Sequence, residues 1–379
     1  MGVFRRIAII FVLVCIFVLP FHDSIYGSLG LALACLTLLF ADVLKMRTMR
    51  FIWQEFALCL LLILAITLAV FKDPYIQYSG LHFVFYYGTP LLMLLAIRRV
   101  WNKGPEWLLL GYAYLAGCVV STIMLIQHWM SGAAFQRISV GDLNTNYVSY
   151  SLATGITVGV ILISLTKSKV RARTLSMIIV FLSFGILLTG TRGSIISIVA
   201  LLLTYLLFQV GRRPFYYLSI FAATVVVSIV LFNIIPEEVS SRILMNSTST
   251  DDVSSGRYDL WSLAYSFFLE APLIGNGIGY FESYGSQHIK VHNVFLSILV
   301  EFGIVGFILY TSVIFSIIFF KAGSMHVKRA RIFFIVSWLP IAMTGVWEFS
   351  SAPWFVFAWL SLFPKEFNSK ISSETRKIK

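Results

Sequence analysis

The sequence predicts an all-α fold, a polytopic integral membrane bundle of about twelve transmembrane helices with both termini in the cytoplasm. Of the 379 residues, 59% are hydrophobic and only 12% are charged, whereas soluble domains average roughly 45–50% and 25%. A soluble domain cannot hide so much apolar surface from water, and intrinsic disorder requires low hydrophobicity. This composition excludes a water-soluble enzyme and a disordered chain.

Apolar runs recur along the whole chain, each close to the roughly 20 residues that cross the hydrocarbon core of a bilayer. Because no internal repeat and no soluble domain are visible, we expect one transmembrane domain over residues 1–379. The predicted spans are 7–21, 24–41, 51–71, 81–97, 107–126, 147–165, 174–190, 194–209, 216–235, 291–320, 331–347 and 350–363.

The positive charges support this order of spans. If the N-terminus is cytoplasmic, all but six of the 29 lysines and arginines fall in cytoplasmic segments, as the positive-inside rule requires. Membrane topology therefore accounts for most of the net charge of +12, and no nucleic-acid partner is required to explain it. The longest connection, 236–290, is external, and loops of that length are usually functional. The six external cations are Lys72, Arg137, Arg192, Arg242, Arg257 and Lys290.

Two of these external arginines lie where an anion could bind. Arg192 occupies a short turn between two apolar helices and either binds an anionic partner or extends to the interface. Arg257 opens an amphipathic stretch that Pro272 ends, and we expect a helix along the membrane surface there. A cation in the first turn opposes the helix dipole, which hints at function, although a solvated loop arginine is an equal alternative.

His292 and Asn293 begin the tenth span, where a histidine can titrate near neutrality and accept a proton. His288 precedes it by four residues without the carboxylate of a zinc motif, so we expect neither a metal site nor a cofactor. In a continuous helix Glu301 lies on the face opposite His292 and cannot assist it.

Three further features receive structural or open interpretations. The segment 275–279 is glycine-rich but follows no strand, so we expect a flexible turn and not a nucleotide loop. Gly303 and Gly306 are expected to permit close helix packing. Glu348, at the outer end of the eleventh span, either orients a sugar or cation or is simply solvated.

Four motifs follow one another in the second half of the chain. They are T-G-T-R-G-S (189–194), S-G-R-Y-D-L-W (255–261), P-L-I-G-N-G-I-G-Y-F (272–281) and H-N-V-F-L-S-I-L-V-E-F-G-I-V-G (292–306), with Asn144 and Asn146 ahead of the sixth span. In this order and spacing they resemble the O-antigen ligase and polymerase family of bacterial membrane glycosyltransferases.

The resemblance implies a metal-independent, inverting enzyme that moves a glycan from undecaprenyl pyrophosphate to an acceptor sugar hydroxyl at the periplasmic face of the inner membrane. Ligases use the lipid A core as acceptor, and polymerases use another lipid-linked repeat unit. By resemblance, Arg192 and Arg257 hold the pyrophosphate and His292 activates the acceptor. We also expect Asn293, the residue after the histidine, to bind substrate. Proteins of polysaccharide assembly or chain-length control are possible partners besides the lipid bilayer.

Two other classes compete with an enzyme. A transporter or flippase often has related halves and a site at mid-membrane, whereas here the notable charges are external. A non-catalytic scaffold does not explain two arginines and a histidine where cations and bases are otherwise sparse. The sequence leaves open ligase or polymerase, the sugar and linkage, and the oligomeric state.

Overall fold

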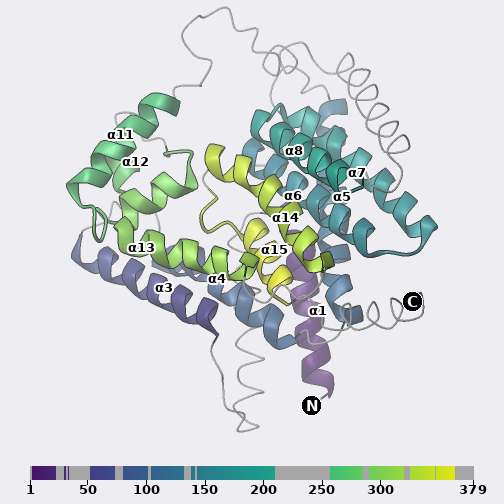
Figure 1. Cartoon of the computed structure of the whole chain (residues 1–379), viewed down its shortest axis with the longest axis horizontal. Coiled ribbons are helices and arrows are strands. Elements are labelled where there is room, and N and C mark those ends of the chain that lie inside the picture. The colour runs from purple at the N-terminus through teal and green to yellow at the C-terminus, as the bar shows by residue number, and fades with distance from the viewer. Residues whose placement is uncertain are drawn as a thin grey trace, which may run out of the picture.

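The fold is helical throughout the residues described by the computed structural model, which are 2–22, 30, 33, 52–72, 80–100, 104–131, 138–140, 143–209, 257–284, 290–319, 325–345 and 347–362 (Figure 1). The helices are α1 (Gly2–Val18), α3 (Trp53–Phe71), α4 (Gly80–Val100), α5 (Gly104–Met130), α6 (Thr145–Leu165), α7 (Lys169–Thr189), α8 (Arg192–Gln209), α11 (Arg257–Glu270), α12 (Tyr280–Tyr284), α13 (Val294–Phe319), α14 (Met325–Thr344) and α15 (Ser351–Ser361).

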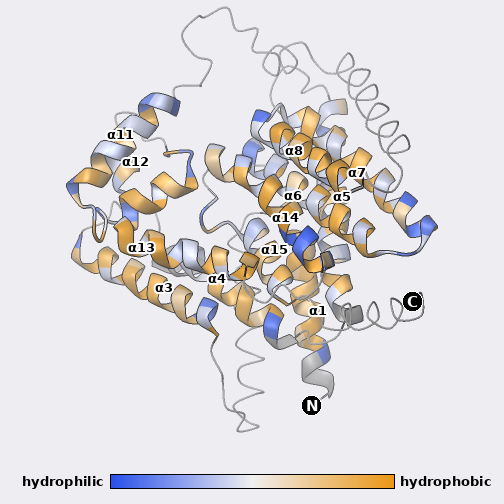
Figure 2. Ribbon diagram, viewed as in Figure 1, coloured by the Kyte–Doolittle hydropathy of each residue, from blue (hydrophilic) through white to orange (hydrophobic). Residues whose placement is uncertain are grey.

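The helices confirm a multi-pass membrane protein. Ten of the twelve predicted spans coincide with helices, while 24–41 (apart from Gly30 and Leu33) and 216–235 lie outside the described residues. By length and composition, α3, α5, α6, α7 and α13 can each cross a membrane. Apolar residues cover the outside of the bundle as well as its interior (Figure 2). The count of twelve and the cytoplasmic placement of both termini remain predictions.

Helix α6 is the centre around which the bundle is built. It packs against α5, α7, α8, α14 and α15, and it is the most buried of the five candidate spans. Asn144 caps its first turn, because Oδ1 accepts a hydrogen bond from Asn146 N at 2.8 Å. Helix α6 is therefore held by a capped first turn and by neighbouring helices along its length.

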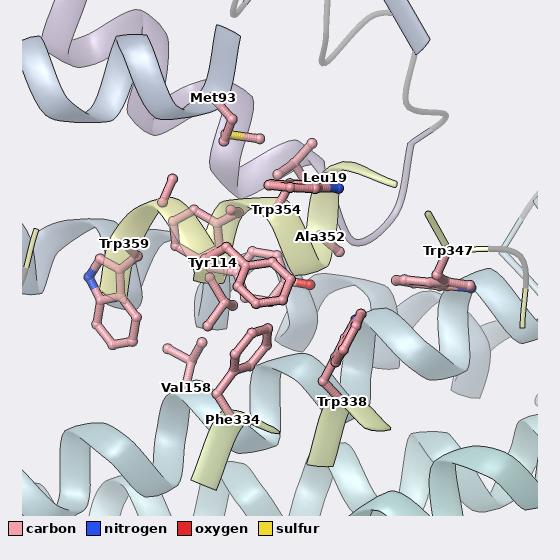
Figure 3. Close-up of a cluster of buried hydrophobic side chains, with 14 of the residues drawn as sticks. Leu19, Met93, Tyr114, Val158, Phe334, Trp338, Trp347, Ala352, Trp354 and Trp359 are labelled. Carbon is pink, nitrogen blue, oxygen red and sulfur yellow. The ribbon is translucent and has the colours of Figure 1, made fainter. Parts of the chain in front are cut away.

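Helix α15 departs from the sequence-based expectation of a twelfth lipid-facing span. It has 11 residues, about 17 Å at 1.5 Å per residue, roughly half the thickness of the hydrocarbon core. Its first ten residues are all buried among neighbouring helices (Figure 3). Trp354 and Phe357 fill this core together with Phe334 and Trp338 of α14.

Trp107 and Trp359 lock α5 to α15. Their rings stack at 4.1 Å between centroids. The Trp107 indole nitrogen donates to the Trp359 carbonyl at 2.8 Å, and the Trp359 indole nitrogen donates to the Trp107 carbonyl at 2.9 Å. Trp107 is 1% exposed, so protein side chains surround its ring. The indole pairs with a partner inside the protein.

Helix α13 is broken at Gly303, where φ is 62° and ψ is −164°. The turn after α11 fills the break with its backbone. Ile304 N and Val305 N donate to the carbonyls of Pro272 and Leu273 at 2.9 and 3.1 Å. In a membrane, groups released by a helix break require such partners. The predicted single helix over 291–320 is therefore two helical segments that meet at Gly303, with the backbone of residues 272–277 packed into the break.

The other side of the break is paired in the same way. Asn276 N and Gly277 N donate to the carbonyls of Val300 and Glu301 at 2.8 and 3.2 Å. The glycine-rich segment is thus fixed by backbone hydrogen bonds, which corrects the expectation of a flexible turn. Lys72, just after α3, also donates through Nζ to the carbonyl of Gly275 at 2.6 Å.

Candidate functional site

The turn between α7 and α8 places Arg192 at the first position of α8. Gly190 ends α7 in the left-handed conformation, with φ of 62°, so the chain reverses direction within two residues. The Arg192 side chain is half-buried. The guanidinium therefore stands at a helix N-terminus, where it adds to the positive end of the helix dipole.

Two side-chain hydrogen bonds fix this turn to the start of α6. Thr191 Oγ1 donates to Asn146 Oδ1 at 3.3 Å, and Ser149 Oγ donates to Ser194 Oγ at 2.7 Å. The asparagine singled out before the sixth span therefore lies beside the arginine turn. Asn146 and Ser149 are three residues apart, and so are Thr191 and Ser194. The two hydrogen bonds therefore align the start of α6 with the turn before α8.

His292 lies ahead of α13 and not on it. Its φ of 53° makes it the one non-glycine residue with positive φ among those the structure describes. Such backbone strain tends to occur at functional sites. The helix begins at Val294, and Asn293 caps it, because Oδ1 accepts hydrogen bonds from Phe295 N and Leu296 N at 3.0 and 3.1 Å. The sequence-based expectation that His292 and Asn293 belong to the helix is corrected accordingly.

The surroundings of His292 favour its neutral form. Burial lowers the pKa of the imidazole, and the positive charges of Arg257 and Lys290 lower it further. Its Nδ1 is buried and has no hydrogen-bond partner within the described structure. A neutral histidine with an unused ring nitrogen can accept a proton or donate one to a ligand.

Arg257 reaches this position because α11 packs against α13. The predicted helix is confirmed: it begins at Arg257 and ends two residues before Pro272. Trp261 Nε1 donates to the carbonyl of Val291 at 3.2 Å, which fixes the first turn of α11 beside the residue before His292. The external loop thus brings a cation to the histidine from 35 residues away in the sequence.

The end of α14 connects the arginine turn with the histidine segment. A Cβ atom built on Gly193 would lie 2.6 Å from Thr344 Oγ1 and 3.0 Å from Tyr150 Oη. The Tyr150 hydroxyl donates to the Thr344 carbonyl at 3.3 Å. Met343, the preceding residue, contacts Asn293 through a 3.9 Å bond from Nδ2 to Sδ. The turn that holds the first arginine and the segment that holds the histidine therefore share one end of the bundle.

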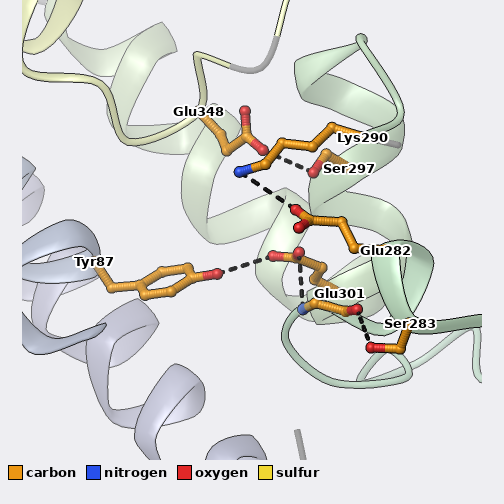
Figure 4. Close-up of polar contacts among 8 residues, drawn as sticks. Tyr87, Glu282, Ser283, Lys290, Ser297, Glu301 and Glu348 are labelled. Carbon is orange, nitrogen blue, oxygen red and sulfur yellow. Dashed lines mark hydrogen bonds and ion pairs between the residues drawn. The ribbon is translucent and has the colours of Figure 1, made fainter. Parts of the chain in front are cut away.

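Polar side chains gather around the first turns of α13 (Figure 4), and of these only Glu348 was considered a substrate contact from the sequence. Glu301 is buried, and its carboxyl oxygens accept hydrogen bonds from the Tyr87 hydroxyl at 3.1 Å and from Gly279 N at 3.2 Å. These contacts agree with the prediction that Glu301 does not assist His292. Lys290 forms an ion pair with Glu282 at 3.3 Å. Glu301 thereby ties α4 to the external loop.

Glu348 belongs to the same cluster and is 5% exposed. Ser297 Oγ donates to Glu348 Oε1 at 2.8 Å, whereas Oε2 has no hydrogen-bond partner within the described structure. Burial raises the pKa of Glu348, and Lys290 is the first of the influences that oppose the rise. The solvated carboxylate considered from the sequence is excluded. One signal was available: between residues 302 and 364 this is the only acidic residue, and such residues inside apolar stretches are usually functional.

Among the described residues, no three His, Cys, Asp or Glu side chains are grouped so that they could hold a metal ion. The residues the structure does bring together are Arg257, Lys290 and His292, with the Arg192 turn joined to them through α14. Arg137, Arg242 and His288 lie outside the described residues.

The fold and this site define a multi-pass membrane protein with cationic groups at the N-termini of two helices and a neutral histidine ahead of a third. The family model described as O-Antigen ligase matches residues 177–311, a segment that contains Arg192, Arg257 and His292. The match confirms the resemblance to the O-antigen ligase and polymerase family and indicates a role in surface polysaccharide biosynthesis of that type. No curated protein matches the chain significantly.

Proposed function

We propose that this protein is a glycosyltransferase that transfers a glycan from undecaprenyl pyrophosphate to a sugar hydroxyl of an acceptor, as an O-antigen ligase or polymerase. The observation that carries the proposal is the half-buried His292, whose pKa is lowered by burial and by the charges of Arg257 and Lys290. A base for this reaction has to be neutral while it is surrounded by the cations that hold a diphosphate. The positions of these three residues meet that requirement.

In the proposed reaction His292 accepts the proton of the acceptor hydroxyl as its oxygen attacks C1 of the donor sugar. The bond from C1 to the pyrophosphate oxygen breaks, and the leaving diphosphate keeps the electron pair. Attack from the side opposite the leaving group inverts the anomeric centre. General-base catalysis of this kind contributes typically 10²–10⁴-fold to the rate.

Arg257 and Arg192 are proposed to bind the pyrophosphate and to stabilise the charge that develops on it. A guanidinium is always protonated and forms paired hydrogen bonds with phosphate oxygens. Each of these arginines begins a helix, and the N-H groups of a first helical turn also favour phosphate. We propose that these charges supply the stabilisation that a divalent metal supplies in other glycosyltransferases.

Asn293 is proposed to act in the same site. Because its Oδ1 already caps α13, its contribution is to hold the start of the helix directly after His292, with Nδ2 as the group that faces α14. The proposed location is the periplasmic face of a bacterial inner membrane, and the acceptor is either the lipid A core or a second lipid-linked repeat unit.

Transfer by the purified protein in lipid nanodiscs tests this function. The donor is the undecaprenyl-linked glycan that accumulates in a strain lacking the gene, and the acceptor glycolipid comes from the same strain. We expect covalent transfer without any ion gradient, and loss of at least about 100-fold in His292→Ala and Arg192→Ala. Arg173→Ala, an exposed arginine near the far end of α7, is the control. Movement of the donor across the bilayer without transfer contradicts the proposal and favours a flippase.

A further inference from the structure

Buried polar atoms without partners collect in the connection from α14 to α15. Glu348 Oε2, Ser350 Oγ and Ser351 Oγ are all buried, and none has a hydrogen-bond partner within the described structure. Ser350 occupies the N-cap position of α15 but makes no side-chain capping bond. Most buried polar atoms are hydrogen-bonded to protein or water, so three such atoms without partners within four residues require an explanation.

The Glu348 carboxyl is held in one orientation. Ser297 fixes Oε1, and the backbone carbonyl of Glu348 accepts bonds from Tyr310 Oη at 2.8 Å and from Trp354 Nε1 at 2.7 Å. Oε2 points away from Ser297 (Figure 4). A carboxyl fixed in this way, with one oxygen unused, is organised in advance to accept a hydrogen bond.

The free oxygen lies on the same side of the bundle as His292. Ser297, its anchor, follows the histidine by five residues and lies about 5 Å along α13 from Val294. Lys290 lies close to both groups: it reaches between Glu348 and Glu282 (Figure 4), and its charge lowers the pKa of His292. Lys290 thus links the surroundings of the histidine with those of this carboxyl.

The charges around Glu348 favour a sugar hydroxyl over an ion as the group that pairs with its free oxygen. A carboxyl repels phosphate oxygens, which have cations available near His292 and Arg257. A second cation is disfavoured by the Lys290 ammonium. A hydroxyl can donate to a carboxyl oxygen and accept from a serine hydroxyl, which matches the three unused atoms.

We propose that Glu348 Oε2, flanked by Ser350, accepts a hydrogen bond from a sugar hydroxyl of the substrate and so helps to select the glycan. This inference rests on the proposed function, because it names a substrate contact of the same reaction. The sugar belongs to the acceptor or to the donor, which share this chemistry and which the test separates.

The test uses Glu348→Gln in nanodiscs with the donor and acceptor lipids described above. In this variant Oε1 still accepts from Ser297, while an amide N-H₂ replaces the free acceptor. We expect the acceptor KM to rise at least about tenfold, because a hydrogen bond to a charged group is lost. If the donor supplies the sugar, donor binding measured by native mass spectrometry weakens by the same factor, which also supports the proposal.

Glu301→Gln is the matched control. It is a second buried carboxyl on α13, but both its oxygens are paired inside the protein, and an amide can keep both contacts by accepting from Gly279 N and donating to Tyr87. We expect unchanged KM and donor binding. Equal constants for Glu348→Gln and wild type would show that the free atoms hold only water and would overturn the inference.

Ser350→Ala keeps the inference testable if Glu348→Gln does not fold. Removing an unpaired buried hydroxyl does not lower stability, so a purely structural role leaves KM and donor binding unchanged. A rise of about threefold in acceptor KM or donor Kd at an unchanged melting temperature supports a sugar contact, and no rise in either contradicts it. If the wild-type protein transfers no glycan, that result contradicts the proposed function itself, whereas the variants test only the contact of Glu348 and Ser350 with the sugar.

Discussion

Gly275 and Gly303 face each other without side chains across the break in α13. A Cβ atom on Gly303 would lie 2.5 Å from Gly275 N, and one on Gly275 would lie 2.3 Å from the Glu301 carbonyl oxygen. Both residues have positive φ, 62° at Gly303 and 79° at Gly275. The external loop and the membrane helix therefore approach more closely than any other residue type permits.

Gly303→Ala should destabilise the protein and release the loop. The conformation at Gly303 is one that essentially only glycine adopts, so strain alone costs roughly 1–3 kcal/mol, and the new methyl group also displaces the 272–277 backbone. We expect a lower melting temperature in detergent and faster hydrogen exchange at Asn276 and Ile304. Gly88→Ala, where a Cβ would meet no atom within 4 Å, should change neither. Equal exchange in both variants would contradict the role of the break.

The pH dependence of transfer should follow the lowered pKa of His292. The base is active when neutral, so the rate falls as the pH drops through a pKa below 6.5, the ordinary pKa of a histidine. Lys290→Met removes a positive charge, raises the pKa of His292 and moves the acid limb to higher pH. The profile of kcat/KM against pH measures the shift. Lys169→Met, an exposed lysine at the start of α7, serves as control, and identical acid limbs in both variants would contradict the assignment of His292 as base.

Substitutions of Asn293 separate helix capping from direct substrate binding. Asp and Ser both cap helices well, whereas Ala costs about 1 kcal/mol of stability at this position. If capping is the main role, Asn293→Ser and Asn293→Asp keep the melting temperature and most of the transfer rate, and Asn293→Ala loses both. Loss of transfer in all three at an unchanged melting temperature would show that the amide nitrogen itself binds substrate.

Trp359→Phe should weaken the contact between α5 and α15. The phenyl ring still stacks on Trp107, but the indole hydrogen bond to the Trp107 carbonyl is lost, at a cost of about 0.5–1.5 kcal/mol. Thermal unfolding measures the loss. Trp53→Phe is the matched control because Trp53 is 52% exposed, and an equal loss in both variants would show that the reciprocal hydrogen bonds are not the cause.

The candidate site was predictable where local sequence carries the signal. Arg192 and Arg257 stand out because external segments of membrane proteins contain few cations, and the structure places each at the start of a helix. The helix over 257–270 follows from apolar spacing and from Pro272. His292 is distinctive as a histidine at the mouth of an apolar run.

Glu348 shows what the sequence could not give. Its free oxygen depends on Ser297, Tyr310 and Trp354, which belong to other helices. The lowered pKa of His292 depends on burial and on the charge of Arg257, which comes from a different helix. Contacts of this kind follow from packing between distant segments, and no local pattern records them.

Composition by itself determined that this chain is a helical membrane protein, because transfer of apolar residues into lipid acts on each segment separately. Only the tertiary structure decided that α13 is broken and filled by the loop, that α15 is enclosed, and that the Glu348 carboxyl is buried. Those features arise because backbone and side-chain groups pair between segments far apart in the chain. Few arrangements of the helices give every buried polar group a hydrogen-bond partner.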